Sequence, residues 1–294
     1  MKPSSWILAI RPRTLPASVA PVMMGTAMAF GDGLFHLPSF LMALAGALCI
    51  QIGTNLANDY FDFKKGADTQ NRQGPMRVTQ AGLIAPQKVL FAAILFFGLA
   101  ALSSLYLIHR AGPVILLIAI LSIVCGIFYT AGSRPLGYLG LGDILVLIFF
   151  GPVAVGGTYF VQAREINWPV IVAGLAPGFL SVALLAVNNL RDIETDKLAG
   201  KNTLGVRFGK NFVMGEYLFC IIAVTIMPFL VYLIMQDHAG MTMASLIGFF
   251  AIPSVHGVLT KPDGPVLNRV LAQTGGLLVL YTLLFSLGWL LWSR

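Results

Sequence analysis

Apolar runs long enough to cross a bilayer recur along the whole chain and restrict its fold more than any other feature. A helix needs about 20 apolar residues to span the hydrocarbon core. Nine such segments can be marked, at residues 14–30, 38–61, 87–108, 112–131, 141–162, 168–190, 212–235, 241–258 and 270–292. Charged residues make up only 11% of the chain, whereas an average soluble domain has about 25%. We therefore predict a single all-α domain over residues 1–294, a multi-pass membrane helical bundle with about nine transmembrane helices around a central cavity.

The distribution of Lys and Arg orients these predicted helices. If the N-terminus faces the cytoplasm, 16 of the 19 Lys and Arg residues lie on the cytoplasmic side. The other three, Arg110, Arg164 and Arg294, lie on the opposite side. Because cytoplasmic loops carry an excess of basic residues, we predict a protein of the inner (plasma) membrane with its N-terminus inside and its C-terminus outside. This bias explains the basic composition, so we do not predict binding to nucleic acid. The sequence also indicates no obligatory protein partner.

Two polar motifs interrupt the apolar pattern, and each follows a predicted transmembrane helix. They read NLANDYFDFKKGAD and NNLRDIETDKLAGKNT. Asn55, which opens the first, aligns with Asn188, which opens the second, at an offset of 133 residues, and each is followed four residues later by an aspartate. This echo predicts two related units, of roughly residues 1–135 and 136–294, that face one cavity. Both motifs lie on the predicted cytoplasmic side.

Helical spacing predicts an acidic stripe in each motif, because residues three or four apart share one face of a helix. The first stripe is Asn55, Asp59 and Asp62, and the second is Asn188, Asp192 and Asp196. Carboxylates are costly in a membrane and are functional candidates by default. Two facing acidic stripes repel each other unless a cation lies between them. Mg²⁺ prefers carboxylate oxygens and bridges to substrate phosphates, so we predict Mg²⁺ as the cofactor, with Asp59, Asp62, Asp192 and Asp196 as its ligands and as the catalytic residues.

Basic side chains next to the acidic stripes are suited to binding phosphate oxygens. The candidates are Lys64, Lys65, Arg72, Arg77, Lys197, Lys201 and Arg207, of which Lys65, Arg72, Arg77 and Lys201 are predicted to contact the substrate. Acids and bases at the cytoplasmic mouth of an apolar cavity together predict a metal-bound diphosphate with a lipid-soluble tail as the substrate.

At these residues the sequence resembles the UbiA superfamily of intramembrane aromatic prenyltransferases, whose hallmark is two aspartate-rich motifs on nine transmembrane helices. It is most similar to the branch that acts on 1,4-dihydroxy-2-naphthoate in menaquinone biosynthesis. That likeness lies in RPRTLPASVAPVMMGTA from Arg11, NDYFDFKKGAD from Asn58, YTAGSRPLGYLGLGD from Tyr129, FFGPVAVGGTYFVQ from Phe149 and NNLRDIETDKLAGKNTL from Asn188. The 4-hydroxybenzoate branch typically has the third aspartate of the first motif two positions before Asp68, where this chain has Gly66.

The resemblance implies transfer of a polyprenyl group from a polyprenyl diphosphate to the naphthoate ring, with loss of CO₂, giving a demethylmenaquinone. It implies substrate contacts from Asn55, Asn58, Lys65, Asp68, Arg72, Arg77, Tyr129, Arg134, Asn188, Asn189 and Lys201. One departure concerns the family's Tyr-x-x-x-Lys-Arg signature, because Ser133 replaces its lysine. The carboxylate of the acceptor needs a cationic partner, and the sequence leaves three candidates open: Arg11, Arg13 and Arg134.

Two alternatives stay open at this point. One is a prenyltransferase for 4-hydroxybenzoate or another aromatic acceptor. The other is an ion-coupled membrane transporter, in which the intramembrane carboxylates relay ions. Transporter sites lie near the middle of the bilayer at broken helices, whereas these acids lie at predicted helix ends. The length of the isoprenoid tail is not encoded in any of these motifs.

Overall fold

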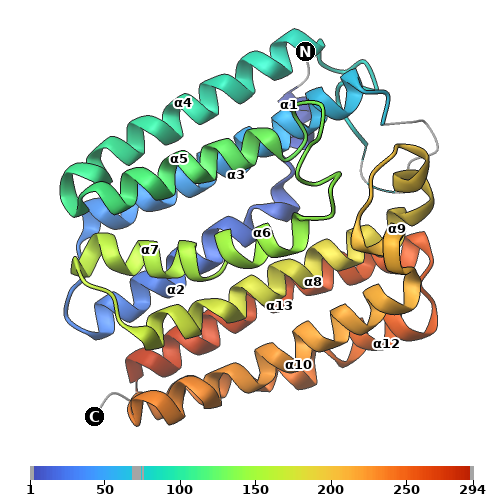
Figure 1. Ribbon diagram of the computed structural model, residues 1–294. Helices are drawn as coiled ribbons and strands as arrows, with labels where there is room; N and C mark the ends of the chain where they lie inside the picture. Colours follow the sequence, from blue (N-terminus) through green and yellow to red (C-terminus); the bar gives the residue numbers. More distant parts are fainter. Residues whose placement is uncertain (1–2, 68–73, 75, 292–294) are drawn as a thin grey trace.

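The computed structural model describes residues 3–67, 74 and 76–291 of the chain. Every regular element in this part is helical (Figure 1). In chain order the elements are α1 (Pro3–Ile10), the 3-10 helix η1 (Pro12–Thr14), α2 (Pro16–Gly31), α3 (Leu37–Lys64), α4 (Pro86–Ala111), α5 (Pro113–Phe128), α6 (Gly142–Phe149), α7 (Pro152–Ala163), α8 (Trp168–Leu198), α9 (Leu204–Phe208), α10 (Lys210–Met235), the 3-10 helix η2 (Ala239–Leu246), α11 (Ile247–Phe250), α12 (Ile252–Thr260) and α13 (Gly264–Leu291).

The predicted transmembrane segments coincide with these helices. Among the described residues, seven helical segments are long and apolar enough to cross a membrane, and α2 joins α1 and η1 in an eighth, bent one. The remaining predicted segment, 112–131, contains α5, an apolar helix of 16 residues that is too short to be counted with them. The all-α membrane bundle is therefore confirmed. The division into two related units stays a prediction.

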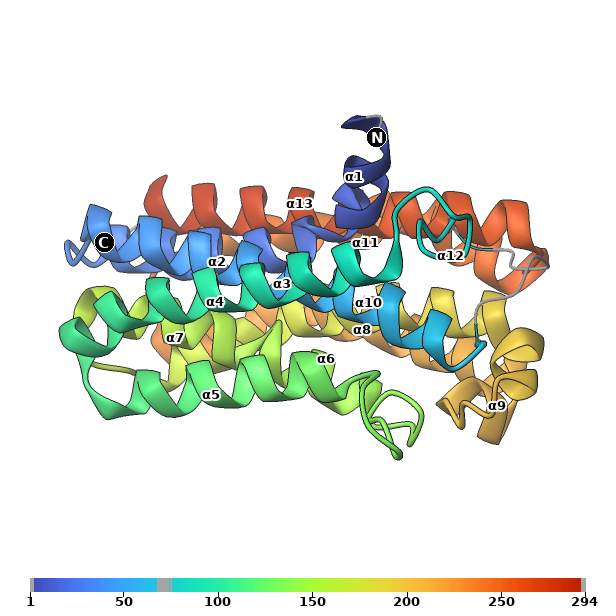
Figure 2. The ribbon, with the colours of Figure 1, turned by 90° about the horizontal axis from the view of Figure 1, so that it is seen from above.

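Breaks interrupt two of the predicted segments and lie at the start of a third, and a proline occupies the first turn of the helix after each break. Segment 141–162 consists of α6 and α7, which are separated at Gly151 just before Pro152. Segment 241–258 consists of η2, α11 and α12, with Pro253 in the first turn of α12. The N-terminal segment bends by 50° between η1 and α2, and Figure 2 shows α1 standing out from the bundle at this bend. Proline lacks the N–H that a continuous helix needs, which explains why helices restart at it.

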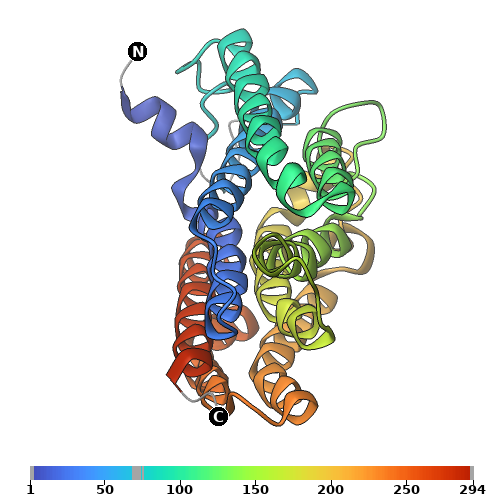
Figure 3. The ribbon, with the colours of Figure 1, turned by 90° about the vertical axis from the view of Figure 1, so that its left-hand side faces the viewer.

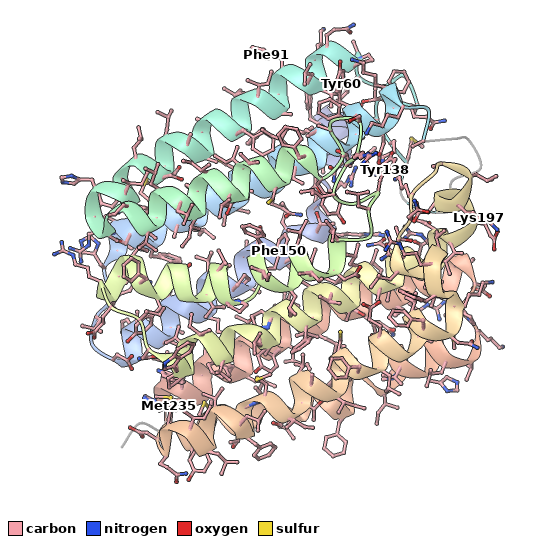
Figure 4. The ribbon with its side chains drawn as sticks, in the orientation of Figure 1. Tyr60, Phe91, Tyr138, Phe150, Lys197 and Met235 are labelled. Carbon is pink, nitrogen blue, oxygen red and sulfur yellow. The ribbon has the colours of Figure 1, made fainter. Side chains whose placement is uncertain are left out.

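The long helices lie side by side and form one bundle (Figure 3). The largest buried cluster joins α2, α7, α8, α10, η2 and α13. A second, smaller cluster joins α1, α3, α4 and the segment between α3 and α4. A third joins α2, α3, α4, α5 and α7. The polar motifs lie at one end of the bundle: in Figure 4, Tyr138 and Lys197 lie at that end and Met235 lies at the other. We call the first the polar end.

Close packing of α13 against η2 depends on a glycine. A Cβ atom at Gly288 would overlap the backbone carbonyl of Gly240. Gly276, on the same helix, has nothing within 4 Å of an added Cβ atom. We expect Gly288→Ala to lower the free energy of unfolding by about 1–3 kcal/mol, as overpacking does, and Gly276→Ala to leave it unchanged or slightly raised. Thermal unfolding of both variants in the same detergent measures the difference; equal stabilities would contradict this packing.

Candidate active site at the polar end

An apolar cavity of about 300 Å³ lies between the helices and extends to residues near the polar end of the bundle. Its walls come from α2 through α7, with many aliphatic and phenylalanine side chains. Asn55, Asn58 and Tyr129 line it at the end near the first motif. Among the described lining residues none is charged. Such a cavity suits a hydrocarbon tail whose polar head lies at the motif.

Of the two described aspartates in the first motif, Asp62 has more side-chain partners. Its side chain is only 2% exposed. The hydroxyl of Tyr138 donates a hydrogen bond to Oδ1 at 2.9 Å. Nη2 of Arg77 and Nζ of Lys201 lie 3.4 Å and 3.3 Å from Oδ2. A buried carboxylate requires such partners, because an unpaired buried charge is strongly destabilising.

Lys201 brings the two acidic motifs together. Besides its contact with Asp62, its Nζ lies 3.9 Å from Oδ1 of Asp196 on α8. The carboxylates of Asp62 and Asp196 therefore lie within reach of one ammonium group, although 134 residues separate them in the chain. This contact agrees with the predicted meeting of the two motifs at one site.

Asp192 is held by its own neighbour in the sequence. Nε and Nη2 of Arg191 donate to its two carboxylate oxygens at 2.8 Å and 2.7 Å. The same guanidinium donates to the side-chain oxygens of Asn188 at 3.0 Å and of Asn268 on α13 at 2.8 Å. Such a bidentate pair fixes the direction of a carboxylate. Asp192 remains 14% exposed, so its outer face stays accessible.

Asp59 occupies a different environment from the one that the helical spacing predicts. Its carboxylate accepts hydrogen bonds from the backbone N–H groups of Val78 and Thr79 at 3.2 Å and 3.0 Å. The side chain is 1% exposed. The carboxylate of Asp59 is therefore directed to the segment before α4 and binds backbone there, whereas that of Asp62 contacts Tyr138, Arg77 and Lys201. The role of Asp59 as a metal ligand stays a prediction.

Asn55 also makes structural contacts. Its amide donates to the backbone oxygen of Ile10 and to Oγ1 of Thr14, both at 2.9 Å. These bonds hold the corner between α1 and α2 against α3. Asn58, three residues later, accepts a hydrogen bond from Thr130 at 2.8 Å and lines the cavity. Asn58 and Asp62 have the same four-residue spacing as Asn188 and Asp192. The alignment that pairs Asn55 with Asn188 overlooks this second match.

The remaining predicted residues are distributed around this end. Lys65 donates to the backbone oxygen of Thr130 at 2.7 Å. Asn189 is buried on α8, with its backbone next to Gly205. The ring of Tyr129 packs against the turn that leads into α6, and Arg134 is exposed. Asp68 and Arg72 lie outside the described residues, so the structure provides no contacts for them.

Two residues at the site had no predicted role. Tyr138, in the loop between α5 and α6, bonds to Asp62, and its ring centroid lies 4.7 Å from Nζ of Lys65 and 5.1 Å from Nζ of Lys201. Its backbone oxygen accepts a hydrogen bond from the N–H of Asn202. Arg191, which enters the prediction only as one of the 16 basic residues on the predicted cytoplasmic side, orients Asp192. Position inside a motif was the available signal for Arg191, whereas no sequence pattern indicates that Tyr138 folds over Asp62.

The acids that meet here suit a divalent cation only if a ligand completes the site. Within the described part of the chain, no group of three or more His, Cys, Asp or Glu side chains could hold a metal ion. Mg²⁺, however, usually takes one or two carboxylates together with waters and substrate phosphates. Asp62 and Asp196, which share Lys201, fit that arrangement, and Asp192 lies one helical turn before Asp196 on α8.

Comparison with known proteins gives consistent results. The model of the UbiA prenyltransferase family matches residues 18–272. The 1,4-dihydroxy-2-naphthoate octaprenyltransferase of Escherichia coli (strain K12) is 43% identical over 212 residues, covering 70% of this chain and 69% of the relative. That of Haemophilus influenzae is 36% identical and covers 97% and 96%. A UbiA homologue from Archaeoglobus fulgidus, solved with DMAPP and Mg²⁺, has the same fold, with a TM-score of 0.60, 15% identity and coverage of 94% and 99%.

Proposed function

Since the chain belongs to the UbiA prenyltransferase family, we propose that it transfers a polyprenyl group from polyprenyl diphosphate to 1,4-dihydroxy-2-naphthoate, with decarboxylation to a demethylmenaquinone. Relatives that are 43% and 36% identical bear the name of this activity. The protein is an enzyme embedded in the membrane, and its apolar helices agree with that location. The 4-hydroxybenzoate acceptor and ion transport are therefore the less favoured alternatives.

One observation supports the diphosphate site more than any other. Lys201 contacts Asp62 from the first motif and Asp196 from the second. A pair of carboxylates on either side of a cation, at the mouth of an apolar cavity, is the arrangement that a metal diphosphate with a hydrocarbon tail requires. We place the diphosphate at this point and the tail in the cavity.

The chain's own residues then have distinct tasks. Lys65, Arg77 and Lys201 bind the diphosphate oxygens and stabilise the negative charge that develops as the allylic C–O bond breaks. Arg191 orients Asp192, and Tyr138 orients Asp62. The uncharged cavity walls hold the isoprenoid and exclude water, which would otherwise capture the allylic cation. The naphthoate ring carbon captures it instead. Asn188 and Asn189 complete the α8 side of the site.

Mg²⁺ is the cation that we assign to Asp62, Asp192 and Asp196, where it would neutralise the diphosphate as a leaving group. The solved homologue from Archaeoglobus fulgidus bound DMAPP together with Mg²⁺. We omit Asp59, whose carboxylate binds the backbone of Val78 and Thr79.

The bias of Lys and Arg supports a cytoplasmic position for the polar end, with the N-terminus on the same side. A diphosphate made in the cytoplasm then reaches the site without crossing the bilayer. Labelling of single cysteines introduced at Ser133 and Gln236, which lie at opposite ends of the bundle, tests this orientation in intact cells.

A prenylation assay with purified full-length protein tests the function. We expect product from polyprenyl diphosphate and 1,4-dihydroxy-2-naphthoate, with a mass that corresponds to loss of CO₂. Chelation with EDTA should abolish turnover, and added Mg²⁺ should restore it. Product with 4-hydroxybenzoate instead, a product that retains its carboxylate, or turnover that is indifferent to the chelator would each contradict the proposal.

Tyr138 provides a graded prediction. Tyr138→Phe removes only the hydroxyl that bonds to Asp62 and should lower kcat/KM for the diphosphate about 10-fold, the effect of one hydrogen bond to a charged group. Tyr138→Leu also removes the ring next to Lys65 and Lys201. We expect it to lower kcat/KM by about a further 3-fold. Steady-state kinetics with varied diphosphate and Mg²⁺ separate the two effects. Equal activities of the two variants would exclude a role for the ring.

A further inference from the structure

We infer that Arg11 binds the carboxylate of the aromatic acceptor, in a subsite between the α1–α2 corner and α3. This inference rests on the proposed aromatic acid substrate and names the residue that selects it. Three arginines satisfy the requirement for a cation near the first motif, and their surroundings differ. Arg13 and Arg134 are exposed, whereas Arg11 is partly buried.

Arg11 does not line the cavity itself but contacts a residue that does. Its Nη2 lies 3.4 Å from the backbone oxygen of Asn55, a residue that lines the cavity. Ser18, in the first turn of α2, lines the same cavity. Because the described lining residues carry no charge, a carboxylate bound among them needs a cation at the margin of the cavity. Arg11 is in a position to supply it. An ion pair that is partly shielded from water is also worth more than one at an exposed arginine.

The backbone holds Arg11 in a conformation that is unusual for its type. Its φ is 56°, in the left-handed region, which residues other than glycine rarely adopt. Three hydrogen bonds fix this corner: Asn55 donates to Ile10 and Thr14, and the hydroxyl of Thr14 donates to the backbone oxygen of Arg11. Backbone strain that the surroundings enforce in this way is typical of ligand sites.

The spacing along α3 fits an acceptor between Arg11 and the diphosphate. Arg11 contacts α3 at Asn55, and the diphosphate site begins at Asp62, seven residues further along. At 1.5 Å per residue the two positions are about 10 Å apart along the helix axis. A fused two-ring acid that contacts Arg11 through its carboxylate can therefore present a ring carbon toward the allylic end of the donor. Asn58, between the two positions, faces the same cavity.

A pair of ligands that differ only in the carboxylate tests this subsite. The full-length protein in nanodiscs is titrated with 1-hydroxy-2-naphthoate and with 1-naphthol, and empty nanodiscs provide the blank. We expect Arg11→Gln to weaken binding of the naphthoate about 10- to 100-fold, which is the loss of a charge-assisted hydrogen bond. Binding of 1-naphthol and of inorganic pyrophosphate with Mg²⁺ should change less than twofold. Arg13→Gln, which removes an exposed charge two residues away, is the matched control and should bind all three ligands normally.

Any other pattern of binding overturns the inference. Equal loss for the naphthoate and for 1-naphthol would make Arg11 a structural residue. Normal naphthoate binding in Arg11→Gln, or a selective loss in Arg134→Gln instead, would place the carboxylate elsewhere. Arg11→Gly keeps the left-handed backbone without strain and serves if the glutamine variant does not fold. Because binding needs no turnover, a wild-type protein that binds the naphthoate through Arg11 but forms no prenylated product would refute the proposed function alone.

Discussion

Replacing Asp62 by asparagine is expected to lower kcat about 100- to 1000-fold while leaving the protein folded. The change removes one negative charge from the point where Lys201 and Arg77 converge, at an almost unchanged side-chain volume. Tyr138 still finds an oxygen to which it can donate. The loss should therefore fall on the chemical step, since groups aimed at the charge that develops in a transition state contribute on this scale.

The measurement is single-turnover product formation with saturating diphosphate and Mg²⁺, together with thermal unfolding of the same preparation. Asp32→Asn is a suitable control, because that aspartate lies at the other end of the bundle and bonds to Tyr159 at 2.6 Å. It removes an equal charge far from the site, and turnover per folded molecule should stay near the wild-type value. A turnover rate for Asp62→Asn within tenfold of wild type would remove Asp62 from the metal site.

Replacing Asp59 by alanine is expected to destabilise the protein by about 2–4 kcal/mol. Both N–H groups that this carboxylate accepts, those of Val78 and Thr79, belong to buried residues. Removing the acceptor leaves two buried donors without it, and each such donor costs about 1–3 kcal/mol. The segment before α4 would lose two hydrogen bonds to α3 and keep the contact between Arg77 and Asp62. Turnover per folded molecule should remain within about tenfold of wild type, in contrast to Asp62→Asn.

Asp59→Asn is the graded control for that experiment. Its amide keeps one oxygen acceptor, so it should lose about half as much stability as alanine. Thermal unfolding of wild type, asparagine and alanine variants in one detergent gives the series. An alanine variant with unchanged unfolding temperature and no turnover would restore Asp59 to the metal site and contradict the role that its hydrogen bonds indicate.

The two aspartates show how far helical spacing can predict a site. Asp59 and Asp62 are three residues apart on α3, and the spacing rule treats them as neighbours on one face. At about 100° per residue they differ by about 60° around the helix axis. That rotation is sufficient to direct one carboxylate to the backbone of Thr79 and the other to Tyr138 and Lys201. Which of the two reaches the site depends on what packs around α3.

Tyr138 and Arg11 show a second limit. Tyr138 lies 76 residues from Asp62 in the chain, and Arg11 lies 44 residues from Asn55. Neither distance corresponds to a helical period, so no pattern within one segment can indicate the contact. The loop between α5 and α6 reaches Asp62 because its backbone is also held by Asn202, and Arg11 reaches α3 because Asn55 binds both sides of its corner.

The sequence alone determined the class of fold, the positions of the transmembrane segments and the end of the bundle at which the polar motifs lie. These properties follow from the cost of placing apolar residues in water and charged residues in lipid, which depends on composition within each segment. Only the tertiary structure decided that Asp62 rather than Asp59 shares Lys201 with Asp196, that Tyr138 bonds to Asp62, and that Arg11 contacts Asn55. Those choices depend on the rotation of each helix and on the course of each loop, which are fixed by packing between residues far apart in the chain.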